Sequence, residues 1–472
     1  MSRASQSNWG SRGYRQTATK RPWRQQKSIQ QSPSPPMGEV LATIHQKDLQ
    51  DSGFDSKDTA SITESQYLSS YNLLNRKDNS ILVPGEPPVW TPLSTPTQLQ
   101  NDSGEYFRDQ NAARFPKFPI QPMVQAVLAE NPDFRFQDID IIACGSTLGN
   151  LLRFVRRQNH SFRMLVEAIG NAVFFIRREN SPTEKIPNVY GYGHAFPEAY
   201  TTWSVTVKSS ESHQRIMKYD FAGLKCLVRF QADGYLPELV AKGKEKHHNG
   251  GLKHDKDLSE DDLILSIKET TLSNISAEAM SETGQPLKMS EAGNHIPQSA
   301  IFDLKTRSIR KKNEEDTIGE ELARLWIAQI PNFLLAYHTA GVFSDIQIRD
   351  VREDIEKWEK KQQPALMQFA YLLNMIVTFV RSSELGRLEI TRKEGSSVLE
   401  LRAQCQDARR ALPPSYLDQI LDEAHGDSSG NSDTANEGGI LLTWDDDEDE
   451  EQDYTACSAS TCGYCGHCKH KH

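Results

Sequence analysis

Apolar and polar residues alternate along several short stretches of this chain, and each such stretch predicts a β-strand. The stretches lie at residues 134–143, 162–166, 172–176, 224–230, 299–306, 333–338, 388–391 and 398–401. Ile169-Gly170-Asn171 connects the second stretch to the third, and Lys393-Glu394-Gly395 connects the last two. Short connections of this kind predict two β-hairpins.

Apolar residues at helical spacing separate these strands. The spacing predicts helices at residues 147–157, 318–328, 351–380 and 416–424. Pro364 lies inside the third helix and predicts a break or kink there, because proline has no amide hydrogen to donate. This mixture of strands and helices predicts an α+β fold with a mixed β-sheet flanked by helices.

The segments outside this core have a different composition. Residues 1–85 are rich in Ser, Gln, Asn and Pro without a sustained period, which predicts a disordered arm before a globular domain at residues 86–425. Residues 241–298 form a polar stretch that we interpret as a surface insertion, and residues 426–472 are predicted to be a disordered acidic tail. No stretch is apolar for long enough to cross a membrane, and the N-terminus lacks the apolar core of a secretory signal. We therefore expect a nuclear or cytoplasmic protein that is not secreted.

Charge is distributed unevenly along the chain. The net charge is -10 over 472 residues, yet residues 1–30 contain seven Lys and Arg and no acid, whereas residues 445–451 are an unbroken acidic run. Such segregation indicates interaction tails on a globular body. The basic arm also contains Trp9, Tyr14 and Trp23, which suits either a sequence-tolerant RNA-binding arm or an ordinary disordered terminus.

Four of the seven cysteines lie among the last sixteen residues: Cys457, Cys462, Cys465 and Cys468. Together with neighbouring histidines they could bind Zn²⁺, although the cluster is compact for a closed zinc site, and an unstructured tail is the alternative. An odd number of unevenly spaced cysteines does not resemble a disulfide framework. It predicts a reducing compartment.

Two strand segments carry the candidate chemistry. Asp233 lies at the end of one strand, while Asp303 and Lys305 lie two residues apart in another and therefore project to the same face. Carboxylates that hold a pair of Mg²⁺ or Mn²⁺ ions about 3.5–4 Å apart can activate water and neutralise a phosphodiester. This is the logic of a PD-(D/E)XK nuclease core. By itself, the D-x-K tripeptide is more typical of an exposed strand face with a solvated charge pair than of a nuclease site.

The order of the motifs over residues 134–424 resembles the Rai/DXO family of decapping nucleases, which cleave RNA with defective, absent or metabolite-type 5′ caps. Asp233 stands where that family has the Asp of Glu-Val-Asp, and 303–306 stand where it has Glu-Leu-Lys-Thr. The other matching pieces are Phe134 to Leu152, Tyr192 to Glu198, Leu325 to Gln329, and the hairpin Leu388 to Leu401.

The resemblance implies a site and its ligands. It assigns metal binding to Glu198, Asp233, Asp303 and the Leu304 carbonyl, nucleophile positioning to Lys305, and orientation of water or substrate to Gln329. It further implies Mg²⁺ or Mn²⁺ as cofactor, RNA 5′ ends as the substrate, and a 5′-3′ exoribonuclease as a candidate partner.

Three departures from the family pattern bear on this assignment. Cys144-Gly145 replaces an arginine-glycine turn whose arginine would contact a substrate phosphate. Asp303 is one methylene shorter than Glu, and Pro197 is inserted before Glu198. Two functions stay open within this fold: metal-dependent hydrolysis at RNA 5′ ends, as decapping, pyrophosphohydrolase or 5′-3′ exonuclease activity, and a catalytically inactive protein that binds RNA 5′ ends or an exonuclease. A third, more distant option is an unrelated nucleic-acid-binding protein with a basic arm and an acidic tail, which would leave the D-x-K alignment unexplained. The lost arginine favours the second, and the retained acids and lysine favour the first.

Overall fold

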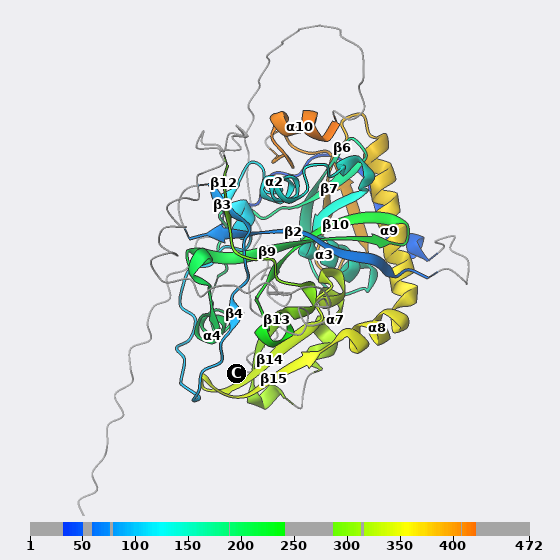
Figure 1. Ribbon diagram of the computed structural model, residues 1–472. Coiled ribbons are helices and arrows are strands. Elements are labelled where there is room, and N and C mark those ends of the chain that lie inside the picture. The colour runs from blue at the N-terminus through cyan, green and yellow to red at the C-terminus, as the bar shows by residue number, and fades with distance from the viewer. Residues whose placement is uncertain are drawn as a thin grey trace, which may run out of the picture.

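The computed structural model describes residues 32–50, 59–75, 79–187, 189–240, 287–312, 316–406 and 408–421. Within these residues the strands form two sheets (Figure 1). The larger runs in the order β1 (Val40–His45), β17 (Val398–Arg402), β16 (Arg387–Arg392), β6 (Phe162–Ile169), β7 (Ala172–Arg177), β5 (Ile141–Cys144), β10 (Leu224–Ala232), β9 (Ser210–Phe221), β2 (Ile62–Leu74), β3 (Ser80–Pro84) and β12 (Lys288–Ala292). Parallel β5–β10 and β5–β7 pairs among antiparallel neighbours make this a mixed sheet.

The smaller sheet runs in the order β15 (Val342–Asp350), β14 (Asn332–Thr339), β13 (Ile301–Ser308), β11 (Gly234–Tyr235), β4 (Val89–Trp90) and β8 (Thr201–Thr202). The chain passes from the larger sheet to the smaller one at Asp233, the single residue between β10 and β11. Gly234 allows this crossing, because a Cβ there would lie 2.5 Å from the Phe302 ring and 2.8 Å from the Pro88 carbonyl oxygen. The junction therefore places Asp233 beside β13.

Helices cover both faces of the larger sheet. On one face lie α3 (Gly145–Val155), α7 (Thr317–Ala328), α8 (Arg352–Lys361) and α9 (Gln363–Ser382), and on the other lie α2 (Gln121–Glu130) and α10 (Pro414–Leu421). The short α1 (Gln110–Arg114) precedes α2, and α4 (Ala195–Tyr200) packs on the smaller sheet. Each large apolar side chain buried in these layers stabilises the fold by roughly 1.5–3 kcal/mol.

The expectation that no stretch is apolar for long enough to cross a membrane is not met, because helix α9 is long and apolar enough by length and composition alone. Its Phe369, Leu372 and Ile376 are instead buried in the main core, with exposed fractions of 0–1%. These contacts make it a core helix of the domain. The break between α8 and α9 falls at Gln362, and Pro364 occupies the first turn of α9, as the sequence predicts.

Most predicted elements are confirmed, including both hairpins, the strand that carries Asp303, and the helix that follows it. The strand predicted at 134–143 is wrong in its first half. Residues Phe136–Asp138 form a 3₁₀ turn, and the strand spans only Ile141–Cys144. Phe134 and Phe136, two residues apart, both pack on the same core cluster at this turn, so their spacing imitates strand alternation.

The expected disorder of residues 1–85 does not hold for Val40–His45, Ile62–Leu74 and Ser80–Pro84, which form β1, β2 and β3. The polar residues that suggested disorder are buried and hydrogen-bonded. Ser69 Oγ donates to Ala126 O at 2.9 Å, Ser70 Oγ to Pro84 O at 2.7 Å, and Asn72 Nδ2 to Glu86 O at 2.9 Å. Buried polar groups with internal partners let a polar sequence form a central strand.

The predicted insertion is also shorter than expected at its C-terminal end. Residues Lys288–Ala292 form β12, which pairs in parallel with β3. Residues 241–286, the acidic run and the four clustered cysteines Cys457, Cys462, Cys465 and Cys468 lie outside the described residues.

Candidate functional site

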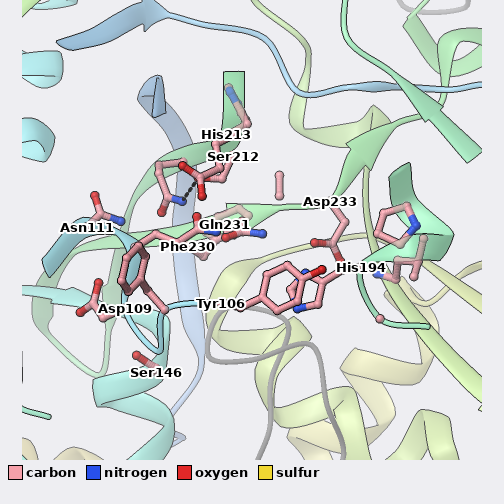
Figure 2. Close-up of a pocket in the computed structure, with 18 of the residues that line it drawn as sticks. Tyr106, Asp109, Asn111, Ser146, His194, Ser212, His213, Phe230, Gln231 and Asp233 are labelled. Atoms are coloured by element: carbon pink, nitrogen blue, oxygen red, sulfur yellow. Dashed lines mark hydrogen bonds between the residues drawn. The ribbon is translucent and has the colours of Figure 1, made fainter. Parts of the chain in front are cut away.

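A cavity of about 200 Å³, here called the first cavity, lies where the two sheets meet (Figure 2). Asp233 and His194 stand at one end of it, and Asp109 and Ser146 at the other. The residues of the sequence-based site that line it are Glu198, Asp233, Leu304 and Lys305. The sequence motifs thus meet at one place in the fold.

The carboxylate of Asp303 lies behind this cavity and is neutralised from within the chain. Asp303 and Lys305 are only 1% and 4% exposed, and both face α7. Arg324 of α7 donates Nη2–H to Asp303 Oδ1 at 2.8 Å and Nη1–H to Asp303 Oδ2. Two parallel hydrogen bonds of this kind are the strongest pairing that a guanidinium makes with a carboxylate.

Glu321, one turn earlier in α7, completes a buried ion cluster. Its Oε1 lies 2.9 Å from Lys305 Nζ, and its Oε2 accepts from Arg324 Nε at 2.9 Å. Although burial opposes both shifts, the two cations hold the pKa of Glu321 far below its usual range, and Asp303 and Glu321 raise the pKa of Arg324. All the hydrogen-bond directions fit two ionised acids and two ionised bases.

Asp233 touches this cluster from the junction between the sheets. Its Oδ2 accepts from the Leu304 amide at 2.9 Å. Burial, and next the negative charge of Asp303, raise the pKa of Asp233 to about 8, which Arg324 only partly opposes. Burial also raises the pKa of Asp303, although Arg324 opposes that shift. Protonation of Asp233 is therefore favoured, and with Asp233 protonated the buried ion cluster of Asp233, Asp303, Lys305, Glu321 and Arg324 carries no net charge.

This donor set does not fit a pair of divalent ions. Mg²⁺ and Mn²⁺ require oxygen ligands that no fixed cation already occupies, whereas both oxygens of Asp303 accept from Arg324. Gln231, which stands at the Glu of the Glu-Val-Asp motif and lines the first cavity, offers an amide in place of a carboxylate. Over the described ranges, no group of three or more His, Cys, Asp and Glu is arranged to hold a metal ion.

The other two predicted site residues lie apart from this cluster. Glu198 of α4 lines the first cavity, where burial and then Asp102 raise its pKa. Gln329 ends α7 in the left-handed conformation, and its Nε2 donates to Trp326 O at 2.6 Å. Glu198 therefore faces the same space as Asp233, while the Gln329 amide is turned onto its own helix. The roles assigned to Glu198, Asp233, Asp303, Leu304, Lys305 and Gln329 stay predictions.

Arg324 and Glu321 are site residues that the sequence did not reveal as such. The available signal was weak: an acid and an arginine three residues apart on an otherwise apolar helix, which more often form a surface pair. A second missed feature is the stack of Tyr106 on His194, whose ring centroids lie 3.4 Å apart at 2° between planes. Both rings line the first cavity.

The N-terminus of α3 opens into the first cavity at Gly145 and Ser146. Cys144, the N-cap residue, provides no side-chain acceptor for the first amides of the helix. Unsatisfied amides and the positive end of the helix dipole make such an end attractive to anions. Gly145 and Ser146 therefore place unsatisfied helix amides on the lining of the first cavity.

The arrangement of the sheets and helices is similar to that of solved structures. Rai1 of Scheffersomyces stipitis, solved with (3′-NADP)⁺ and calcium, superimposes with a TM-score of 0.50 at 10% identity, covering 82% of this chain and 100% of that one. Rai1 of S. pombe with 3′-FADP gives 0.48 at 11% identity over 78% and 100%, and Rai1 of Candida albicans with pU5-Mn²⁺ gives 0.47 at 10% over 83% and 100%. The fold is that of the Rai1/Dxo1 decapping nucleases, as the sequence resemblance predicts, in a divergent form.

The chain belongs to the family described as "Domain of unknown function (DUF8563)", whose model matches residues 39–398. No curated protein matches it.

Proposed function

We propose that this protein binds the 5′ end of RNA in the first cavity and does not hydrolyse it. The observation that carries the proposal is the Arg324–Asp303 pair, because a fixed guanidinium holds both oxygens of a carboxylate that a nuclease would offer to metal. With Asp233 protonated, the cluster needs no further cation. The fold supports a nucleotide as the ligand, since the S. stipitis protein of this fold holds a dinucleotide.

The chain's own residues offer two recognition elements in the first cavity. The amides at the start of α3 suit the 5′-terminal phosphate, and Ser146 lies beside them to donate a further hydrogen bond. The Tyr106–His194 stack offers a flat aromatic surface on which a base can pack. A protein that binds RNA 5′ ends in this way would also suit a 5′-3′ exoribonuclease as its partner, in the nucleus or cytoplasm.

Metal-dependent hydrolysis at RNA 5′ ends, as decapping or exonuclease activity, is the second candidate. The observation that favours it is the meeting of Asp233, Asp303 and Lys305 at the junction of the sheets, with Glu198 across the cavity. It requires Arg324 to leave Asp303 before an ion of Mg²⁺ or Mn²⁺ is held.

Binding is tested with two RNAs of one sequence, one with a 5′-phosphate and one with a 5′-hydroxyl, by fluorescence anisotropy in EDTA. We expect the phosphorylated RNA to bind roughly tenfold more tightly, because charge-assisted bonds to helix amides are strong. Ser146→Glu should abolish that preference by placing a negative charge at the helix N-terminus. Ser344→Glu, at an exposed position of β15, is the matched control and should preserve it.

Hydrolysis is tested with the same phosphorylated RNA, and with triphosphate and metabolite-capped RNAs, incubated with Mn²⁺ and resolved on denaturing gels. The proposal expects no product with the unmodified protein. A product that disappears in Asp233→Asn would establish the second candidate instead. Equal affinity for the phosphate and hydroxyl RNAs would remove the 5′-end assignment.

A further inference from the structure

A second cavity, of about 410 Å³, lies beyond the end of β7. Four basic side chains line it, namely Lys117, Arg178, Arg409 and Arg410, together with the single carboxylate of Glu179. The lining thus contains more positive than negative groups, and the question is whether the surrounding acids compensate them.

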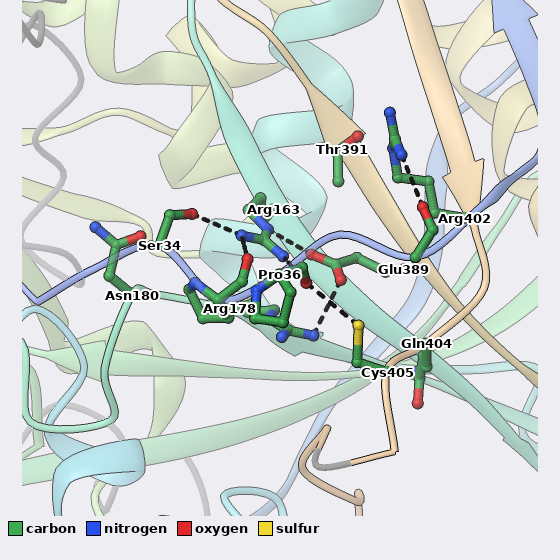
Figure 3. Close-up of polar contacts among 12 residues, drawn as sticks. Ser34, Pro36, Arg163, Arg178, Asn180, Glu389, Thr391, Arg402, Gln404 and Cys405 are labelled. Carbon is green, nitrogen blue, oxygen red and sulfur yellow. Dashed lines mark hydrogen bonds and ion pairs between the residues drawn. The ribbon is translucent and has the colours of Figure 1, made fainter. Parts of the chain in front are cut away.

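Arg178 shares its acid with another arginine (Figure 3). The carboxylate of Glu389 is fully buried, and it accepts from Arg163 Nε at 2.5 Å and from Arg178 Nη1 at 3.0 Å. Arg163 Nη1 also donates to Pro35 O at 2.7 Å, which fixes the segment that forms one wall of the cavity. One negative charge therefore serves two cations.

Two further acids near the second cavity, Glu167 and Glu179, form ion pairs with arginines other than Arg409. Glu167 Oε1 accepts from Arg410 Nε at 2.5 Å, and its Oε2 accepts from the Ala411 amide at 2.8 Å. Glu179 pairs with Arg177 Nε. Among the described residues, Glu167, Glu179 and Glu389 are thus each paired with an arginine other than Arg409.

Two of the four lining cations, Lys117 and Arg409, remain after these pairs. Lys117 is exposed to water, whereas part of the Arg409 guanidinium is buried. Among the described residues its buried Nη1 has no hydrogen-bond partner. Burial is the main cause that lowers the pKa of Arg409, and Arg178 and Arg177 add to it, while Asp109 and Glu179 oppose. A buried donor without an acceptor costs roughly 1–3 kcal/mol, which an anion in the cavity would recover.

We propose that the second cavity binds a backbone phosphate of the RNA whose 5′ end lies in the first cavity, with Arg409 as the principal contact. This inference rests on the proposed function. Residues that line the two cavities are neighbours in the chain, since Arg177 lines the first, and Arg178 and Glu179, which follow it directly, line the second. Asp109, a residue of the first cavity, is also close enough to Arg409 for its negative charge to raise the pKa of that arginine. In the proposed arrangement, a polyanion whose 5′ end lies at α3 would continue past Asp109 to Arg409.

The test compares a 5′-phosphorylated mononucleotide with a 5′-phosphorylated pentanucleotide, titrated against the full chain at several salt concentrations. Arg409→Gln should weaken the pentanucleotide roughly tenfold and leave the mononucleotide within about twofold. It should also reduce the salt slope of the pentanucleotide by about 0.7, the value for one single-strand phosphate contact. Arg409→Lys, which keeps the charge, should recover part of the loss. Arg349→Gln, at an exposed position of β15, is the matched control and should change neither ligand.

Other outcomes separate this inference from the proposed function. Equal loss for both ligands, or no loss for either, would overturn the second cavity as an RNA site. Titration with inorganic tripolyphosphate covers the case in which no RNA binds. Arg409-dependent binding of tripolyphosphate would then retain an anion site while both RNA assignments fail, and absence of binding would remove the site as well. If tripolyphosphate binds only after residues 445–451 are changed to their amides, the acidic run of this chain is the occupant, and the RNA assignment is wrong.

Discussion

Two buried groups of charges in this protein differ in whether the chain itself neutralises them. Around Asp303 the charges cancel within the chain, because Arg324 and Lys305 neutralise Asp303 and Glu321 and Asp233 keeps its proton. Around Arg409 they do not cancel, and a buried donor has no partner among the described residues. Charges removed from water are stable when paired and costly when left alone.

The comparison shows where a ligand is needed. On a fold shared with decapping nucleases, the charges at the position where a metal ion is expected are already balanced by residues of the chain. In the second cavity, which contains no sequence motif, the positive charges are not balanced by the described residues. The site that the sequence motifs predict, around Asp303, and the site whose charges leave room for a ligand, around Arg409, are therefore different places in this molecule.

The largest effect is expected from breaking the complete cluster. Arg324→Met removes the cation and leaves Asp303 buried without its partner, so it should lower the free energy of unfolding by roughly 3–5 kcal/mol. Urea denaturation in EDTA measures this. Arg349→Met, at an exposed position of β15, should change stability by less than about 0.5 kcal/mol. A loss of similar size in both variants would show that the Arg324 pair has no special role.

The same variant should acquire an affinity for metal. Without Arg324, the carboxylates of Asp233, Asp303 and Glu321 share one cation, Lys305, and a divalent ion can complete the balance. At a hundredfold excess over its Kd, Mn²⁺ should restore about 2.7 kcal/mol to Arg324→Met and leave the unmodified protein unchanged. Thermal or urea unfolding with and without Mn²⁺ measures the difference. Equal stabilisation of both proteins would mean that the ion binds elsewhere.

Asp233→Asn should change how the stability of the protein depends on pH. The folded pKa of about 8 lies above the ordinary value of 3.8, so between these values the folded state keeps a proton that the unfolded state has released. Stability of the unmodified protein should therefore fall as pH rises through this window and level off above about pH 8. The amide cannot ionise, so the advantage of Asp233→Asn should grow by at least about 1 kcal/mol between pH 5 and pH 8, within a limit of about 1.4 kcal/mol per pH unit. Urea midpoints at the two pH values test this, and a difference that does not change with pH would contradict it.

The smallest effect, and one of opposite sign to that of Arg324, is expected at Arg409. Removing an unpaired cation with Arg409→Gln should leave the ligand-free protein equally stable or more stable by up to ~1 kcal/mol at low salt. Tripolyphosphate should raise the melting temperature of the unmodified protein and have a weaker effect on the variant. Destabilisation comparable to that of Arg324→Met would remove the contrast between the two regions.

The sequence predicts the strand and the helix that form the site, but not the ion pairs between them. Strand periodicity placed Asp303 and Lys305 on one face, and helical spacing predicted α7, because both depend on local pattern. The pairing of Arg324 with Asp303 depends on how α7 packs against β13, which no local pattern contains. The strands at residues 40–84 were missed for a related reason, since Ser69 and Asn72 satisfy their hydrogen bonds only in the assembled sheet.

If Arg324 takes the place of a metal ion at Asp303, the number of Mn²⁺ ions that the chain binds should not depend on Asp233, and electron paramagnetic resonance of Mn²⁺ measures that number. The number of ions bound by the unmodified chain is compared with the number bound by Asp233→Asn, so that ions on the acidic run cancel in the difference. The account predicts equal numbers for these two proteins and at least one additional ion for Arg324→Met. An ion bound by the unmodified chain and lost in Asp233→Asn would contradict it.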